Sequence, residues 1–282
     1  MILAPLRGVT IRCFRSVFGP LMREAGFTEA MTPFITANAG VDPLRDRELK
    51  GGAECGLRVT PQFIGKDPSA LKTCLERVKA AGYATADLNC GCPFPMVRNK
   101  GRGSGLLRTP DVLRRMLETG CEVMGPGAFS AKTRLGVERP DELLGLMSVF
   151  NEFPLRFLTV HARTARQMYE GSCDMAAFRE VASAAKVPVV YNGDAGLGGI
   201  DGFDVMVGRG FIRAIGERDD AEAWLARYVD ASLGELRSPH PVLGRMKELV
   251  AYWRDLPRWA RRWNVVKLAR NLDELRSGLG LV

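Results

Sequence analysis

The sequence is poor in long apolar runs and in regularly spaced cysteines, and each shortage excludes a class of protein. No run approaches the roughly 18 apolar residues that a membrane-spanning helix needs, so we expect no membrane partner. The first residues, Met-Ile-Leu-Ala-Pro-Leu-Arg, have neither a basic start nor a long apolar stretch, so we expect no secretory signal. The seven cysteines are odd in number and irregularly spaced, which is typical of reduced thiols in the cytoplasm.

Histidine is also scarce, and metal-binding patterns are missing. Cys90 and Cys92 are separated by one residue, and no second cysteine pair follows them, so we expect no zinc site and no other metal. A cysteine nucleophile of the hydrolase type needs a neighbouring base, and only His161 and His240 are available. Metal-dependent chemistry and cysteine-hydrolase chemistry are therefore both disfavoured.

Positive charge is concentrated near the end of the chain. The formal net charge is +8, and the segment from Arg237 onward supplies +6 of it, with ten Lys or Arg against four Asp or Glu. Basic charge gathered in one segment is the expected footprint of a polyanionic partner such as a nucleic acid. The alternative is an ordinary solvated helical face.

The hydrophobic pattern alternates between short β-type runs and amphipathic stretches, which indicates βα units and a parallel sheet. Eight such units favour an α/β fold of the (β/α)8 TIM-barrel type over residues 1–236. Only ten residues lie between the last two runs, so the seventh helix is predicted to be shortened or missing. The predicted strands are 2–8, 27–36, 58–65, 84–91, 129–136, 157–164, 187–193 and 204–208.

A small all-helical domain is predicted for residues 237–282. Pro239-His240-Pro241 is typical of a linker, and two helices are expected at about 242–254 and 257–271. Three of the four tryptophans lie here, interleaved with arginines that include Arg261 and Arg262. Guanidinium groups match phosphate geometry, whereas aromatic residues at helical spacing are more often core.

Polar side chains close one predicted strand after another. Since active sites of such barrels gather at the C-terminal ends of the strands, these residues are predicted to share one site. They are Gln62, Asn89, Cys92, Lys132, Arg134, His161, Arg163, Asn192, Asp194 and Arg209.

The last two strands add a phosphate-type pattern. Asn192-Gly193-Asp194 and Gly208-Arg209-Gly210 would present backbone N–H groups and a guanidinium where barrels commonly hold a phosphate. The alternative is a pair of glycine turns.

Cys92 is the most distinctive candidate. It closes Asp87-Leu88-Asn89-Cys90-Gly91-Cys92-Pro93 just past a predicted strand. A thiol with an ordinary pKa near about 8.5 stays protonated at neutral pH, so it suits a proton donor. The glycine-rich segment 100–105 that follows is either a loop that closes over substrate or a plain turn.

These motifs, in this order, resemble the tRNA-dihydrouridine synthases, and most of all their bacterial C-type branch. The resemblance covers about residues 2–210, and the basic tail resembles that family's RNA-binding helical domain. Besides the cysteine motif, the matching segments are Leu3–Thr10, Lys132-Thr133-Arg134, His161–Thr164 with Gln167 and Tyr169, Asn192-Gly193-Asp194 and Gly208-Arg209-Gly210.

The resemblance implies an FMN-dependent reduction of a uridine in tRNA, with NADPH as reductant. Cys92 would protonate the uracil ring, Asn89 and Arg163 would hold it, and Arg261 and Arg262 would bind the RNA. The implied FMN contacts are Pro5, Leu6, Arg7, Gln62, Lys132, His161, Asn192, Gly193, Asp194, Gly208 and Arg209.

Two other interpretations stay open. One is an FMN-dependent barrel that reduces a small molecule, and the other is an RNA-binding relative whose reductase activity has decayed. The basic tail and Cys92 favour the tRNA enzyme over the first of these. We expect a cytoplasmic monomer.

Overall fold

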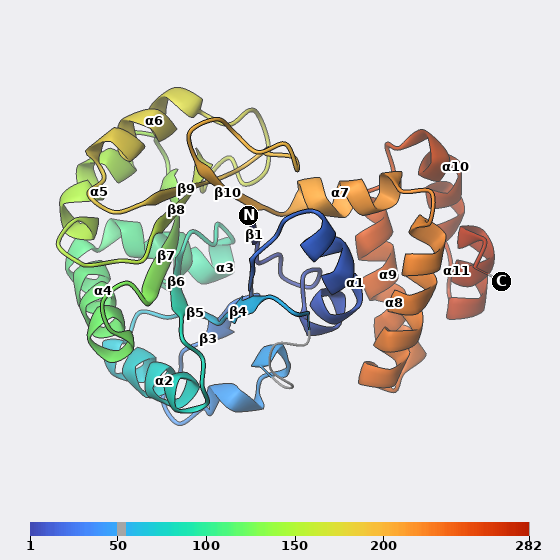
Figure 1. Ribbon diagram of the computed structural model, residues 1–282, viewed down its shortest axis with the longest axis horizontal. Coiled ribbons are helices and arrows are strands. Elements are labelled where there is room, and N and C mark those ends of the chain that lie inside the picture. The colour runs from blue at the N-terminus through green and yellow to red at the C-terminus, as the bar shows by residue number, and fades with distance from the viewer. Residues whose placement is uncertain (50–54, 282) are drawn as a thin grey trace.

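A computed structural model describes residues 1–49 and 55–281, and its central feature is a ring of short parallel strands (Figure 1). The hydrogen-bonded order is β3-β5-β6-β7-β8-β9-β10-β1-β2-β4, and each pair of neighbouring strands is parallel. The strands are β1 Ile2–Leu3, β2 Glu29–Met31, β3 Ile35–Thr36, β4 Arg58–Thr60, β5 Gln62–Ile64, β6 Ala86–Cys90, β7 Phe129–Gly136, β8 Leu158–Thr164, β9 Val189–Asn192 and β10 Asp204–Val207.

The ring has eight positions, as predicted, because two predicted strands are each interrupted. Pro33 separates β2 from β3, and Pro61 separates β4 from β5. A proline has no N–H to donate to the ladder, so the pairing breaks there. Since β2 pairs with β4 and β3 with β5, each broken strand fills one position of the barrel. The predicted (β/α)8 fold is confirmed.

Helices cover the outside of the ring, and local signals explain where they begin (Figure 1). The Asp67 side chain accepts a hydrogen bond from the Ser69 N–H at the start of α2, and Pro110 occupies the first turn of α4. The α-helices of this part are α1 Arg12–Glu24, α2 Pro68–Ala80, α3 Pro95–Arg98, α4 Pro110–Met124, α5 Glu142–Phe150, α6 Met175–Ala184, α7 Arg209–Glu217 and α8 Ala221–Leu236.

Two of the eight units depart from the regular pattern. The fully described stretch between β9 and β10 contains turns and no helix, which confirms the prediction for the seventh unit. The second unit was not predicted to differ, yet its described residues before position 50 form only two 3-10 turns, η1 Pro43–Arg45 and η2 Arg47–Leu49.

The C-terminal segment is helical, with two corrections to its predicted details. It contains three helices, α9 Pro239–Ala251, α10 Pro257–Val266 and α11 Leu272–Leu279, instead of two. The predicted second helix ends early, and the Asn271 side chain caps a new helix by accepting from the Glu274 N–H. The predicted linker is wrong as well, since Pro239 opens α9, a position where a missing N–H costs nothing.

The tail packs closely on the end of the barrel chain (Figure 1). Trp253 and Trp259 are fully buried, and their indole N–H groups donate to the Ile212 and Gly216 carbonyls of α7 at 2.6 and 2.7 Å. These two tryptophans are therefore core residues and not stacking platforms for bases. The domain boundary after residue 236 stays a prediction. No helix in the described part of the chain has the length and apolarity to cross a membrane.

Candidate active site

One pocket opens at the C-terminal ends of the strands, where the sequence predicts the site. Its enclosed volume is about 90 Å³, and the space between its walls is about 730 Å³ when the open mouth is included. Most of the predicted residues line it: Pro5, Leu6, Arg7, Asn89, Cys92, Lys132, His161, Asn192, Gly193, Gly208 and Arg209. Arg134, predicted among the polar strand ends, also lines the pocket, and Ala4, Phe34, Gly91, Pro93, Phe94 and Tyr169 complete the lining.

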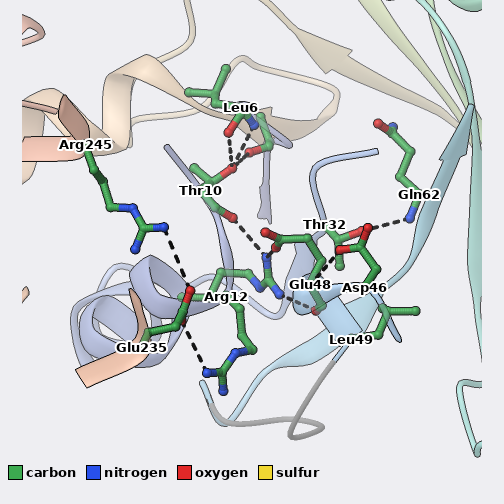
Figure 2. Close-up of polar contacts among 12 residues, drawn as sticks. Leu6, Thr10, Arg12, Thr32, Asp46, Glu48, Leu49, Gln62, Glu235 and Arg245 are labelled. Carbon is green, nitrogen blue, oxygen red and sulfur yellow. Dashed lines mark hydrogen bonds and ion pairs between the residues drawn. The ribbon is translucent and has the colours of Figure 1, made fainter. Parts of the chain in front are cut away.

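The loop after β1 is held in shape by Thr10 (Figure 2). The Thr10 hydroxyl donates to the Ala4 carbonyl at 2.9 Å and accepts from the Leu6 N–H at 2.7 Å. Arg15 in turn donates to the Thr10 carbonyl and to Glu48 at 3.0 and 2.6 Å. The backbone of residues 5–7 is thereby presented to the pocket as a rigid edge.

Cys92 lies on the turn that follows β6. Its side chain lines the pocket and is only 6% exposed. Burial raises the pKa of this thiol, outweighing the Phe94 N–H and the charges of Arg134, Arg7 and Lys132, which lower it. The thiol therefore keeps its proton at neutral pH.

The later part of the glycine-rich segment packs behind Cys92. Residues 103–107 are buried in the 3-10 segment η3 Gly103–Arg108. Ser104 donates to the Cys92 carbonyl through its N–H and its hydroxyl, at 3.1 and 2.9 Å. Gly103 has a φ of +57°, and a Cβ atom there would lie 2.7 Å from that of Cys92. Glycine is required at 103 so that this segment can pack against the cysteine.

The opposite wall carries Lys132 and Asn192. The Lys132 ammonium donates to the Asn192 side-chain oxygen at 2.8 Å, and Asn192 donates to the Met206 carbonyl at 2.8 Å. Burial, together with the charge of Arg134, lowers the pKa of Lys132 to about 7. Lys132 is therefore about half protonated at neutral pH, and an anionic group bound in the pocket would favour its charged form.

His161 is neutral in this setting. Burial lowers its pKa well below the ordinary range, and the neighbouring cations Arg134, Lys132, Arg163 and Arg209 lower it further. A neutral imidazole can form hydrogen bonds with a ligand, but it cannot serve as a cationic partner.

Arg163 is placed differently from its predicted role. Its side chain is 2% exposed and does not line the pocket. It donates to both Asp194 oxygens at 3.0 and 2.5 Å, to the Gly171 and Glu170 carbonyls at 2.6 and 3.2 Å, and to the Cys173 sulfur at 3.0 Å. Its donors are therefore engaged in holding the loop after β8.

Asp194 lies beside the pocket rather than in its lining. Besides the bonds from Arg163, its carboxylate accepts a hydrogen bond from Arg209 at 3.0 Å. Asp194 therefore orients Arg209, which belongs to the phosphate-type pattern Gly208-Arg209-Gly210. Arg209 opens α7, and Gly208 before it has no side chain to cap the first N–H groups of that helix. The start of α7 thus offers donors to an anion.

Gln62 lies beneath the pocket and not in its lining. It is fully buried, and its amide is engaged with Asp87 and Asn89 at 2.8 Å each. The structure therefore gives Gln62 a supporting position below Asn89.

Two arginines in the tail differ in availability. Arg262 pairs with Glu222 of α8 and lies over the Trp259 ring, and Arg258 shares the same carboxylate. Arg261 is exposed and has no polar partner in the part of the chain that the structure describes. Only Arg261 of the predicted pair is free to meet an RNA phosphate.

Sequence reasoning missed the aromatic side of the pocket. Phe34, Phe94 and Tyr169 line it, and Arg134 lies 5.5 Å from the Tyr169 ring centroid. Arg134 and Tyr169 stand in motifs named in the sequence analysis, whereas Phe34, in the break between β2 and β3, and Phe94, at the start of α3, stand in none. Within the described residues no group of three or more His, Cys, Asp or Glu side chains is placed to hold a metal ion.

The family model described as Dihydrouridine synthase (Dus) matches residues 2–196, which include Cys92 and both walls of the pocket up to Asn192. The chain belongs to the dihydrouridine synthase family. Its members include a tRNA-dihydrouridine(16) synthase of Ralstonia nicotianae, 30% identical over 75% of this chain and 69% of the relative. A tRNA-dihydrouridine(16) synthase of Pseudomonas putida is 28% identical over 96% and 88%. A tRNA-dihydrouridine synthase B of Serratia marcescens is 27% identical over 89% and 74%. The predicted family is confirmed.

Solved structures of old yellow enzymes share the fold of this dihydrouridine synthase family member. Morphinone reductase in complex with tetrahydroNAD has a TM-score of 0.52 at 12% identity, over 76% of this chain and 83% of that one. The old yellow enzyme of Trypanosoma cruzi has a TM-score of 0.53 at 10% identity, over 76% and 85%. At these identities the likeness shows the barrel fold alone.

Proposed function

We propose that this protein is a tRNA-dihydrouridine synthase that reduces the C5=C6 bond of a uridine in tRNA with FMN and NADPH. Membership of the dihydrouridine synthase family makes it a flavin-dependent oxidoreductase. The observation that carries the proposal is the protonated thiol of Cys92, which faces the same pocket as the cationic wall of Lys132, Arg134 and Arg209.

The residues of the pocket fit an anionic, partly aromatic cofactor. Leu6, Phe34, Phe94 and Tyr169 supply apolar and aromatic surface, and the lining cations outnumber its acidic groups. FMN supplies hydride transfer when bound. Pro5, Leu6 and Arg7 would contact it through their backbone, and Lys132 and His161 through their side chains. Asn192, Gly193, Asp194, Gly208 and Arg209 would surround its ribityl and phosphate groups.

Cys92 holds the proton that the reaction needs. Because burial raises the pKa of its thiol, the group is protonated at the pH of the cell and can donate to uracil C5. Asn89 reaches the same pocket and would contact the uracil with its remaining amide hydrogen. Arg163 acts on this site through Asp194 and the loop after β8, since its own donors are engaged.

The RNA substrate explains the basic tail. A uracil within a folded tRNA reaches a pocket of this kind only after extrusion, which costs a few kcal/mol. Phosphate contacts from residues such as Arg261 offset that cost without reading the sequence. A tRNA substrate places the enzyme in the cytoplasm, and the monomeric state stays a prediction.

The test is the Cys92→Ala variant. We expect it to retain bound flavin and NADPH oxidation, while uridine reduction falls by about a hundredfold or more, since general acids typically contribute that much. Dihydrouridine in tRNA is measured after incubation with NADPH. Cys121→Ala is the matched control, because that buried thiol lies on α4 and does not line the pocket. Normal tRNA reduction by Cys92→Ala would show that the proton comes from elsewhere.

The same preparation separates the other interpretations. A colourless protein that binds tRNA would indicate a decayed reductase, and salt-insensitive turnover of a free metabolite would indicate a small-molecule enzyme. The missing seventh helix is compatible with activity, since Asn192 and Gly193 still line the pocket at the end of β9. Comparing dihydrouridine in RNA from cells with and without the protein would identify the modified position.

A further inference from the structure

A chain of buried hydrogen bonds runs from the interior of the barrel to the turn that carries Cys92. The Asp87 carboxylate accepts from the Gln62 amide at 2.8 Å, and the Gln62 oxygen accepts from the Asn89 amide at 2.8 Å. The Asn89 oxygen then accepts from the N–H groups of Gly91 and Cys92 at 3.1 and 2.8 Å. Asp87, Gln62, Asn89 and Cys92 are buried, and Gly91 is half-buried.

The strand register places these groups together. Gln62 of β5 and Ser130 of β7 stand opposite Asp87 of β6, and Ser130 donates to the second Asp87 oxygen at 2.7 Å. Asp87 and Asn89 are two residues apart on one strand, so they face the same side of the sheet. The carboxylate thus lies one layer below the asparagine that reaches the pocket.

The carboxylate sets the direction of the whole chain. Asp87 Oδ1 accepts from Gln62 in the ionised form, and also in the neutral form when Oδ2 carries the proton toward Ser130, so the Gln62 amide turns its nitrogen to Asp87 and its oxygen to Asn89. Asn89 must then direct its nitrogen to Gln62 and its oxygen to the Cys92 turn. With the opposite orientation, the Asn89 nitrogen would face two N–H groups and leave them unsatisfied.

The turn depends on this chain for its N–H groups. Its carbonyls have other partners: Arg134 donates to the Gly91 oxygen at 3.0 Å, and Ser104 donates to the Cys92 oxygen. The two N–H groups of Gly91 and Cys92 both donate to Asn89. If Asn89 lost its orientation, the N–H groups of the turn would lose their acceptor while its carbonyls kept their donors. The Cys92 thiol would then shift relative to the pocket.

We propose that Asp87 and Gln62 are positioning residues, which act through Asn89 to fix the turn that holds the Cys92 thiol. The proposal rests on the function proposed above for the use of that thiol, and it goes beyond it by assigning the polar residues beneath the pocket. Gln62 then acts by orienting Asn89, whatever further contact it makes with a ligand.

Two measurements test the proposal on the full-length flavin-loaded enzyme. The first is the rate at which iodoacetamide alkylates Cys92, read from the mass of its peptide. The second is kcat and KM for reduction of tRNA. We expect Asp87→Ala to change the alkylation rate at least about fivefold and to lower kcat by about tenfold to a hundredfold, since misplacement by about 1 Å can cost that much. KM for tRNA should stay within about twofold, because the RNA contacts lie elsewhere.

Asp87→Asn is the conservative variant. Its side-chain oxygen can accept from Gln62 while its nitrogen donates to the Ser130 hydroxyl, so the order of donors and acceptors is kept. We expect kcat and the Cys92 alkylation rate to stay within about threefold of the parent, an ordinary tolerance for preserved geometry. A merely structural role would affect thermal stability in both variants and leave Cys92 alkylation of the folded protein unchanged.

Gln62→Met interrupts the chain at its middle and preserves volume, so it serves if Asp87→Ala does not fold. It should reproduce the kcat loss and the altered alkylation. Parent-like alkylation and kcat in folded Asp87→Ala, or in Gln62→Met, would overturn the proposal. Normal uridine reduction by Cys92→Ala would instead refute the proton-donor role, while the alkylation result would still decide the positioning role.

Discussion

Replacing Arg163 by methionine separates two roles that this residue could have. The family resemblance implies that it holds the uracil, whereas the structure engages its donors with Asp194 and with the loop after β8. Methionine keeps an unbranched apolar stem but removes the guanidinium, which donates to Asp194, to two carbonyls and to a sulfur. The change therefore tests whether Arg163 acts by anchoring the loop.

The expected loss of stability follows from these contacts. The carbonyls of the exposed residues Glu170 and Gly171 lose charged donors, and because water can replace part of each bond, each contributes near the low end of about 1.5–3 kcal/mol. The share of Asp194 is small, because its side chain is 49% exposed and it keeps Arg209. A total of about 3 kcal/mol corresponds to a decrease in Tm of about 6–12 °C for a domain of this size.

Thermal melting and limited trypsin digestion measure the result. Arg166 lies in the anchored loop, so we expect Arg163→Met to be cut after Arg166 faster than the parent. Arg166→Met is the control for stability, since its side chain is 78% exposed and its ion pair with Glu138 at 3.4 Å is worth little. Its Tm should stay within about 2 °C of the parent.

An unchanged Tm, a protected loop and a strongly raised KM for tRNA in Arg163→Met would refute this reasoning. That combination would show that Arg163 meets the substrate directly. A lowered Tm with faster cleavage and a nearly unchanged KM would support the anchoring role.

Two further predictions concern charge. Arg261→Gln should weaken tRNA binding, and the slope of log affinity against log salt concentration should fall by about one phosphate contact. Arg262→Gln should mainly lower Tm, because it loses the ion pair with Glu222. Equal tRNA affinity of Arg261→Gln and the parent at low salt would contradict this. Burial raises the pKa of Asp87 from 3.8 to about 7. The folded state therefore binds this proton more tightly than the unfolded chain does. The stability that the bound proton contributes is lost as the pH rises from about 4 to 7. Asp87→Asn removes that loss, so its Tm relative to the parent should be higher at pH 8 than at pH 5; the same difference at both pH values would count against a buried, titrating carboxyl.

The strand ring was predictable because each unit carries its own local signal. Apolar runs such as 129–136 and 157–164 end in polar residues, and the ends of parallel strands must meet at one edge. Eleven of the predicted ligand-contacting residues line the pocket for this reason. The missing seventh helix was also visible, since ten residues cannot hold a full crossover helix.

Other features depend on contacts that no local pattern reveals. Arg163 and Gln62 stand at strand ends like their neighbours, yet partners distant in the chain engage them, Asp194 in one case and Asp87 in the other. The third tail helix was missed because Asn271 was taken as the end of one helix instead of the cap of the next. Phe34 lies in the break between β2 and β3 and Phe94 at the start of α3, so neither is one of the polar strand ends that mark the site in the sequence.

The indole rings of Trp253 and Trp259 join α7 of the barrel and the helical tail into one packed unit. Both rings press against the inner side of α7, where a Cβ atom on Gly216 would come within 2.5 Å of the Trp253 ring. Truncation after residue 236 would strip α7 of this apolar cover and leave the Ile212 and Gly216 carbonyls without their indole donors. A chimaera that places the tail on another barrel must therefore include α7. The anion-binding N-terminus of α7 would then be transferred together with the tail.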